Sequence, residues 1–354
     1  MDFMNLEKFL KLDKPEKYDF KLLMQEYYKK YEGKHQNDES YKELLERLPE
    51  IEAAEADPIQ QWYLYKTLDV DCLLGKRSYL FDCDGSNGTC DLTTEIYMAL
   101  WPEWIQANFG GDTMNSFATT FSQYGHRSVR TVYKEQYCGD HQQSKELRKI
   151  FQKYAKYVSC LGNFVLVPKG FNGYRGLRSC KDYWDLSLDL LKYNKDEKNR
   201  LADQPDVTDI MGATLPAEAL FRRYINTFFL WDYVTKDFEV APLVPSHKEK
   251  MGIYAQYPYQ NPYPEADEFK IFTNNVNARI LRRGIFMVSM LRIATDSECK
   301  DDYASKIVPV LSTSAYLGSM EDVVRRLTAI PELNQATRYI LKKIDLPDIP
   351  NVEE

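Results

Sequence analysis

Three basic residues, Lys169, Arg175 and Arg178, lie in a short segment interrupted by glycines. This combination predicts a phosphate-binding loop, because glycine lets the backbone turn with its N–H groups exposed and the cations supply positive charge. The glycine spacing matches neither the dinucleotide fingerprint nor the P-loop, so the prediction depends on residue types. The alternative is a structural loop whose arginines pair with carboxylates of the protein itself.

A polar run, GGDTMNSFATTF over 110–121, is the second candidate. Hydrogen-bonding side chains at this density are costly to bury without a purpose. One interpretation is the floor of a pocket, in which Asp112 acts as a base or metal ligand and Asn115 orients the reacting group. The alternative is that Asp112 or Thr113 caps a helix.

His126 lies in a predicted loop between a glycine and an arginine, and it is the histidine that we select as a proton carrier. Asp112, Asn115 and His126 are therefore the candidate catalytic residues. Lys169, Arg175 and Arg178 are the candidate ligand-binding residues.

Two residue pairs have a spacing that could serve a metal. Cys138 and His141 resemble part of a zinc site, and Asp82 with Asp84 at a predicted strand end could support metal or phosphoryl chemistry. A turn explains each pair more simply. We predict no metal site, and the sequence identifies no cofactor.

Other features favour a macromolecular partner instead. Tyrosines and prolines alternate over 254–269 and could stack a base or grip a peptide. Paired arginines at 222–223, 282–283 and 325–326 could form a basic groove, although they are also typical of ordinary surface charges.

These candidates must be positioned by a mainly helical chain. Helical spacing of apolar residues predicts helices over 18–31, 38–51, 58–74, 93–108, 144–160, 179–191, 216–234, 268–295, 301–317 and 320–346. Pro102 and Pro331 are expected to divide two of them. Strands are predicted over 77–82 and 163–168, and the segment 117–133 is ambiguous between extended chain and loop.

The helix after the basic segment is expected to begin at Ser179, which forms a capping box with Asp182. Asp182, Asp185 and Asp189 share one side of this helix, and we expect them to form a solvated acidic face.

The resulting fold class is mainly α with a small β component (α+β), not a doubly wound parallel sheet. We predict a helical N-terminal region over 1–76 and a central α+β region with the candidate site over 77–235. A C-terminal helical region over 236–346 is expected to pack on the same core, followed by a flexible tail over 347–354.

The composition bounds the function class. The chain is 44% hydrophobic and 28% charged with a net charge of −7, which argues against disorder and against nucleic acid as a general partner. No apolar run predicts a membrane span, and the first residues lack the features of a signal peptide. Seven cysteines without a paired pattern suit reduced thiols, so we expect a cytoplasmic protein.

The elements GDTMNSF at 111–117 and GNF-x-x-x-P at 162–168 resemble those of a family of uncharacterised bacterial cytosolic proteins. The resemblance covers roughly residues 77–231. It implies a shared central region in which the polar run and the basic loop occur together, and it implies no activity.

Our leading hypothesis is therefore the binding or processing of a phosphate-bearing small molecule or nucleotide in a central polar pocket. The alternatives are a helical macromolecular-interaction protein without catalysis and a nucleic-acid-binding protein that uses an arginine groove.

Overall fold

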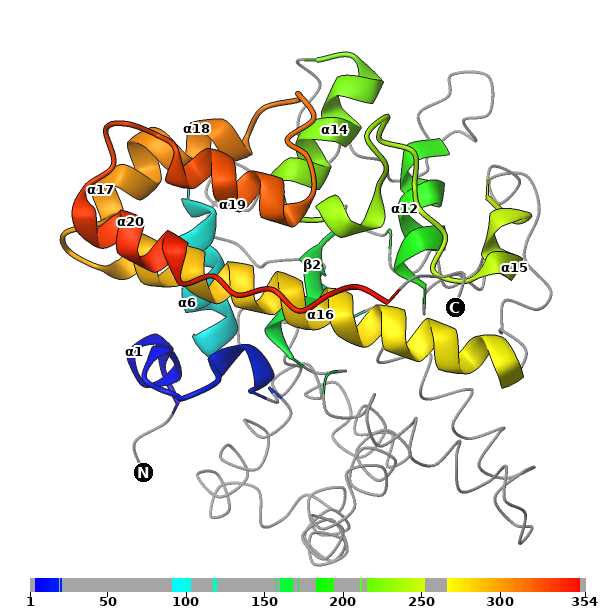
Figure 1. Ribbon diagram of the computed structural model, residues 1–354, viewed down its shortest axis with the longest axis horizontal. Coiled ribbons are helices and arrows are strands. Elements are labelled where there is room, and N and C mark those ends of the chain that lie inside the picture. Colours follow the sequence, from blue (N-terminus) through cyan, green and yellow to red (C-terminus); the bar gives the residue numbers. More distant parts are fainter. Residues whose placement is uncertain are drawn as a thin grey trace, which may run out of the picture.

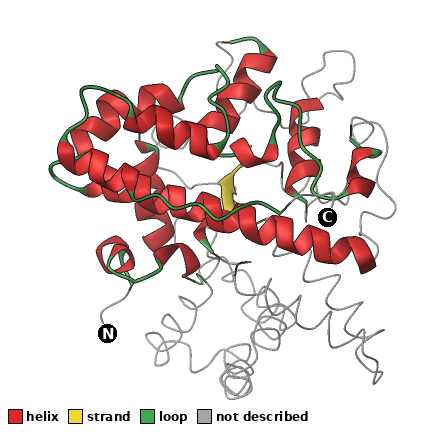
Figure 2. Cartoon of the chain, viewed as in Figure 1, coloured by secondary structure: helices red, strands yellow, loops and turns green. Residues whose placement is uncertain are grey.

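The computed structural model describes residues 4–18, 20, 91–102, 117–119, 157, 160–167, 171, 183–193, 211, 215–251 and 266–350. These residues are mainly helical, with one antiparallel pair of short strands (Figures 1 and 2). The prediction of a mainly α fold with a small β component is confirmed. No helix within these ranges is long and apolar enough to cross a membrane.

The longest described helix, α16 (Ala266–Thr295), has 30 residues and crosses the described part of the molecule (Figure 1). It begins two residues before the predicted start and ends at the predicted residue. Its neighbours come from both ends of the chain. Apolar side chains are consequently buried around several of its faces, among them Val276, Ile280, Phe286 and Leu291.

Two glycines allow other segments to approach α16 closely. The 3-10 turn η5 (Leu161–Asn163) lies against the helix, and a Cβ atom on Gly162 would fall 1.8 Å from the carbonyl oxygen of Ile280. On the helix itself, a Cβ atom on Gly284 would lie 3.3 Å from the Glu16 Cβ atom. Position 162 therefore requires glycine, whereas position 284 leaves some room.

The two strands are β1 (Phe117–Thr119) and β2 (Phe164–Leu166), with Phe117 opposite Leu166. β2 lies within the strand predicted over 163–168. β1 resolves part of the ambiguous segment 117–133 as extended chain.

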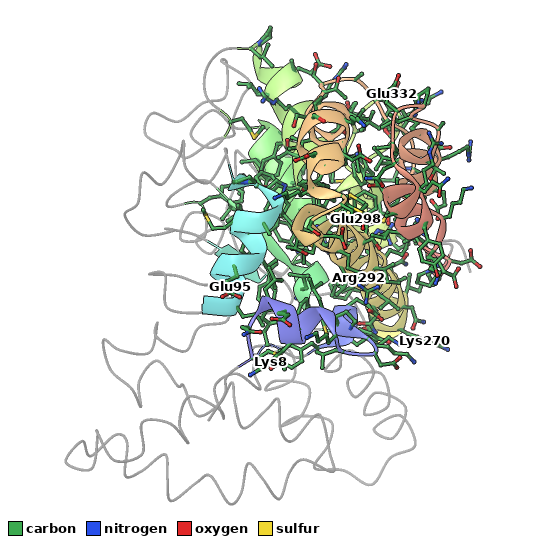
Figure 3. The ribbon with its side chains drawn as sticks, turned by 90° about the vertical axis from the view of Figure 1, so that its left-hand side faces the viewer. Lys8, Glu95, Lys270, Arg292, Glu298 and Glu332 are labelled. Carbon is green, nitrogen blue, oxygen red and sulfur yellow. The ribbon has the colours of Figure 1, made fainter. Side chains whose placement is uncertain are left out.

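Near the N-terminus, α1 (Leu6–Leu10) is capped by Asn5, whose side chain accepts a hydrogen bond from the backbone N–H of Lys8. Beside it lies α6 (Asp91–Leu100), and the carboxylate of Glu95 accepts from the first N–H of α1 at 2.7 Å. Figure 3 shows Glu95 and Lys8 on these neighbouring elements.

The helix α6 ends two residues before Pro102, which confirms that this proline interrupts the helix predicted over 93–108. Trp101, between them, donates its indole N–H to the carbonyl of Thr227 at 2.8 Å. This bond joins α6 to the end of α14 (Ala217–Thr227).

The helix predicted over 216–234 is wrong in its second half. Phe229 follows the end of α14 with a φ of +59°, and the chain continues in the 3-10 turn η6 (Trp231–Tyr233). A left-handed phenylalanine costs about 1–2 kcal/mol. Its ring offsets this cost by packing, with centroid distances of 5.0–5.6 Å, on the rings of Trp101, Trp231 and Phe286.

The helix predicted over 301–317 also ends early. It consists of α17 (Lys300–Asp302), a π-helical turn η7 (Tyr303–Ile307) and α18 (Val308–Leu311). In the loop that follows, the carbonyls of Thr313 and Ala315 accept hydrogen bonds from the Asn226 side chain at 2.6 and 2.9 Å, which hold this segment in a non-helical path.

The last two described helices, α19 (Met320–Thr328) and α20 (Gln335–Lys342), are the halves of the helix predicted over 320–346. The interruption expected at Pro331 is confirmed. The second half ends four residues earlier than predicted, and its first turn is capped by the side chain of Asn334.

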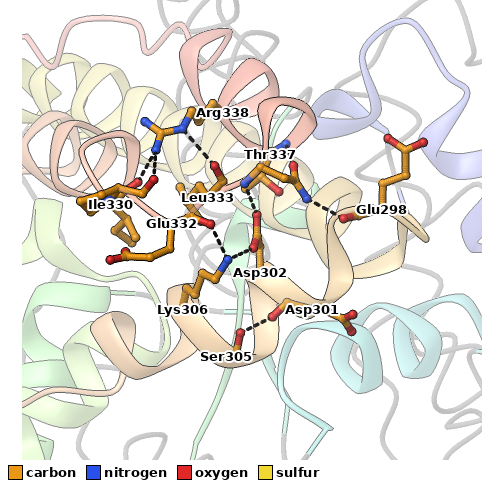
Figure 4. A network of polar contacts seen from close by, with 12 residues as sticks. Glu298, Asp301, Asp302, Ser305, Lys306, Ile330, Glu332, Leu333, Thr337 and Arg338 are labelled. Carbon is orange, nitrogen blue, oxygen red and sulfur yellow. Dashed lines mark hydrogen bonds and ion pairs between the residues drawn. The ribbon is translucent and has the colours of Figure 1, made fainter.

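A polar network fastens the π-helical turn to the connection between α19 and α20 (Figure 4). Lys306 Nζ lies 2.5 Å from an oxygen of Asp302 and donates to the carbonyl of Glu332. The other Asp302 oxygen accepts from the backbone N–H of Asn334 at 2.7 Å. Arg338 donates to neighbouring carbonyls, including that of Ile330 at 2.8 Å, so the connection has one well-defined path.

We expect Asp302→Asn to lower the free energy of unfolding by about 1–2 kcal/mol at pH 7, because it weakens these hydrogen bonds. Burial raises the pKa of Asp302, but hydrogen bonds from Lys306, Asn334 and Thr337 outweigh burial and hold it below its ordinary value of 3.8. The stabilisation is therefore present above that value and is lost as the pH falls through the lower, folded-state pKa. Urea unfolding from pH 7 to pH 2 measures the difference.

The neighbouring Asp301 is the matched control, because its side chain is exposed. Asp301→Asn should leave the unfolding curve almost unchanged. The assigned role of the carboxylate would be contradicted if the difference in free energy of unfolding between the wild type and Asp302→Asn were the same at every pH.

We expect Gly162→Ala to destabilise the protein by about 2–3 kcal/mol, because the new methyl group must push η5 away from α16. Gly284→Ala is the matched control; there the milder crowding is offset by the better helix propensity of alanine. Urea denaturation at one pH compares the three proteins. If both variants lost the same free energy of unfolding, the close approach of the backbone at position 162 would not explain the destabilisation of Gly162→Ala.

Candidate functional site

The six residues selected from the sequence all lie outside the described residues. They fall in the segments 103–116, 120–156, 168–170 and 172–182: Asp112, Asn115, His126, Lys169, Arg175 and Arg178. Also outside are the two residue pairs considered for metal and the tyrosine-proline segment up to residue 265. The structure does describe β1, which lies within the polar run, as well as the strand before the basic segment and the helix after it.

The strand register relates the polar run to the strand that leads into the basic segment. Phe117, inside the polar run, pairs with Leu166, which precedes Lys169 by three positions. Because the strands are antiparallel, the start of β1 and the end of β2 share one end of the ladder. The chain before Phe117 and the chain after Leu166 therefore continue from the same end of the ladder.

Side chains from two helices fix β2. Tyr224 on α14 donates its hydroxyl to the carbonyl of Leu166 at 2.7 Å. Arg283 on α16 donates through Nη1 to the carbonyls of Gly162 and Phe164 at 2.9 and 2.6 Å, and through Nε to that of Phe228 at 2.9 Å. The backbone next to the basic segment is thus held from both sides.

Arg283 is 2% exposed, and no carboxylate among the described residues bonds to it. Burial lowers the pKa of its guanidinium, while the nearby hydroxyls of Tyr97, Tyr233 and Tyr224 raise it. Removing the Arg283 side chain would destabilise the protein, because each of the buried carbonyls that it binds would then lack a hydrogen-bond donor.

The basic segment ends at α12 (Trp184–Tyr193). Tyr183 is not helical, so the expectation of a helix from Ser179 is wrong at this point. Ser179 and Asp182, the predicted capping box, lie outside the described residues.

The expected solvated acidic face is wrong for Asp185 and Asp189, which are both buried. Asp185 accepts hydrogen bonds from the backbone N–H groups of Leu186 at 2.9 Å and Leu243 at 2.7 Å. It also lies 2.6 Å from Nδ1 of His247, on the short helix α15 (Pro245–Lys248). These donors compensate the carboxylate for the loss of water.

Sequence reasoning missed this Asp185–His247 pair. A signal was available: α12 carries apolar residues all around its circumference, including Leu186, Leu188 and Leu190. Such a helix is buried, so a carboxylate on it needs a specific partner.

The arginine pairs have different environments. Arg282, 3% exposed, contacts the carboxylates of Asp232 and Glu321 at 2.7 and 2.6 Å. Burial lowers its pKa, but hydrogen bonds to Glu321 and Asp232 raise it further and give a net increase. Arg325, in contrast, is exposed and paired with Asp322. The pair 282–283 thus lies inside the protein and offers no charge to a surface groove.

A cavity of about 520 Å3 lies beside α1. Each charged residue that lines it already has a partner, since Glu7 pairs with Lys11 and Glu95 binds the backbone of α1. The described residues also contain no group of three or more potential metal ligands. Both described cysteines, Cys160 and Cys299, are buried free thiols, as predicted.

The chain matches no protein-family model, no curated protein and no solved structure. The resemblance to uncharacterised bacterial proteins over 77–231 therefore stays a prediction.

We expect Tyr224→Phe to lower the free energy of unfolding by about 1–2 kcal/mol, because the buried carbonyl of Leu166 loses a donor. Tyr339→Phe is the matched control, since Tyr339 is 60% exposed and its hydroxyl can remain in water; we expect a change within about 0.5 kcal/mol. Thermal or urea unfolding distinguishes the two. If Tyr224→Phe is as stable as the control, the hydrogen bond from Tyr224 does not stabilise β2.

Proposed function

We propose that the protein binds or processes a phosphate-bearing small molecule or nucleotide at the end of the ladder where Phe117 pairs with Leu166. The observation that supports this proposal is the strand register. It relates the polar run to the basic segment, although they are about fifty residues apart in sequence.

Chain length limits how far the candidate residues can lie from this pair. An extended chain spans at most about 3.6 Å per residue. Asn115, two positions before Phe117, is therefore within about 7 Å of it, and Lys169, three positions after Leu166, is within about 11 Å. Asp112, five positions before Phe117, is within about 18 Å.

In this proposal Lys169, Arg175 and Arg178 hold the phosphate, and Asp112 with Asn115 orients the reacting group. Concentrating cations in one loop lets an acidic protein with a net charge of −7 attract an anion locally. The register gives no such support to His126, because the chain that leads to it leaves β1 at the opposite end, beyond Thr119.

Thermal unfolding with inorganic phosphate, ADP and ATP tests the proposal. A ligand at one hundred times its Kd stabilises the folded state by about 2.7 kcal/mol, which raises the Tm of a chain of this size by several degrees. Arg175→Ala should raise the ligand concentration needed for the same Tm shift by at least about tenfold, because a charge-assisted hydrogen bond is lost.

Arg326→Ala is the matched control, since Arg326 is an exposed arginine on α19 and lies outside the two candidate segments. It should respond to the ligands as the wild type does. The proposal fails if none of the three compounds shifts the wild-type Tm, or if Arg175→Ala retains the full shift.

A further inference from the structure

Residues 344–350, here called the strap, follow the end of α20 and run as extended chain along α16 (Figure 1). None of these seven residues is part of a helix or strand. Two apolar side chains of the strap, Ile344 and Leu346, are half-buried and pack against the core. The strap therefore covers part of the surface that α16 and its neighbours would otherwise present to solvent.

Exposure repeats every three residues along the strap. Both of its aspartates are exposed, whereas Leu346 and Ile349, one position after each aspartate, are half-buried. The prolines, Pro347 and Pro350, have the same spacing. A period of three is that of polyproline II, a conformation without internal hydrogen bonds that proline favours. Docking of such a preformed segment is a recurrent mode of peptide recognition, because little entropy is lost on binding.

One side chain holds the backbone of the strap. Arg282 on α16 donates through Nη1 to the carbonyl of Pro347 at 2.7 Å. No other hydrogen bond joins the backbone of 345–350 to the described residues. Pro347 has no N–H group, so it lies half-buried without leaving a donor unpaired. This contact favours an extended segment with proline at that position.

Arg282 is held in place independently of the strap. Its Nε atom lies 2.7 Å from the carboxylate of Asp232 in η6, and its Nη1 atom lies 2.6 Å from that of Glu321 in α19. The side chains of Arg282 and Asp232 are only 3% and 5% exposed. Two carboxylates thus fix the planar guanidinium, so its donor for a carbonyl remains preorganised when the strap leaves.

The strap is held much less firmly than the helices beneath it. It lies near the chain end, and its apolar side chains are only half-buried. Its backbone has the single hydrogen bond from Arg282. Segments with few buried contacts open locally, at free energies far below that of global unfolding. Opening of the strap therefore exposes Arg282 while the helices stay folded.

We propose that the surface around Arg282, Asp232 and Glu321 is a docking site for extended, proline-containing segments of other proteins, and that the strap occupies this site in the resting protein. The strap then acts as an intramolecular competitor, which a partner segment displaces. The chemistry of the partner is that of the strap: a proline whose carbonyl binds Arg282, with apolar residues on either side. This inference goes beyond the proposed phosphate site and does not depend on it.

The test is binding of a fluorescein-labelled peptide, residues 343–350, to the full chain, measured by fluorescence anisotropy. Tethering gives the strap an effective concentration on the order of millimolar, so the wild type should bind the peptide weakly. Leu346→Ala in the full chain removes an apolar contact of the strap and should tighten peptide binding by about tenfold. Asp348→Ala, at an exposed position of the strap, is the matched control and should bind as the wild type does.

Two further measurements identify where the peptide binds. A peptide that carries Pro347→Ala should bind the Leu346→Ala chain about two- to fivefold more weakly, because it is less preorganised. Adding Arg282→Met to the Leu346→Ala chain should weaken peptide binding by at least about tenfold, because the donor to the carbonyl is lost. Arg292→Met is the matched control in the same chain, since Arg292 is exposed on α16.

The inference is overturned if the peptide binds the wild type and Leu346→Ala with equal affinity, or binds neither at millimolar concentration. It is also overturned if a folded Arg282→Met chain binds as tightly as Arg292→Met. If Arg282→Met does not fold, the comparison of the wild type, Leu346→Ala and Asp348→Ala decides, because those variants change only the strap. Tighter binding by Leu346→Ala alone supports the inference.

Discussion

The contact between α16 and the segment that leads into β2 holds the short β ladder against the longest described helix. Arg283 donates to three carbonyls from inside the protein, and Gly162 lets the backbone come close enough for those bonds to form. The planar guanidinium fixes the directions of its donors, so it holds the backbone in one geometry. β1 pairs with β2, so the position of β1 depends on the same contact.

Local patterns predicted the elements whose ends are set by local chemistry. The apolar spacing of α16, the strand at 163–168 and the interruptions at Pro102 and Pro331 are all visible in the sequence. Helix ends set by tertiary contacts were not predictable. Phe229 turns left-handed because distant rings receive its side chain, and α18 stops where a side chain of α14 binds the following loop.

The same distinction applies to the candidate site. Residue types drew attention to the polar run and the basic segment, and strand pairing later related them, but no sequence pattern states which strands will pair. A charged residue such as Asp185 is expected in solvent. It is buried because the backbone N–H of Leu243 and Nδ1 of His247, both distant in sequence, lie beside its carboxylate. The partners of buried polar groups that are distant in sequence cannot be predicted from a single sequence.

The π-helical turn over Tyr303–Ile307 has a consequence for how the length of this chain can vary. A turn closed by bonds between residues five apart contains one residue more than an ordinary α-helical turn. Pro309, just beyond it, has no N–H for the preceding turn, which favours this wider geometry. A chain shorter by one residue here could close a regular helix while α17 and α18 kept their buried faces. Deletion of a single residue is therefore expected to be accommodated at this turn.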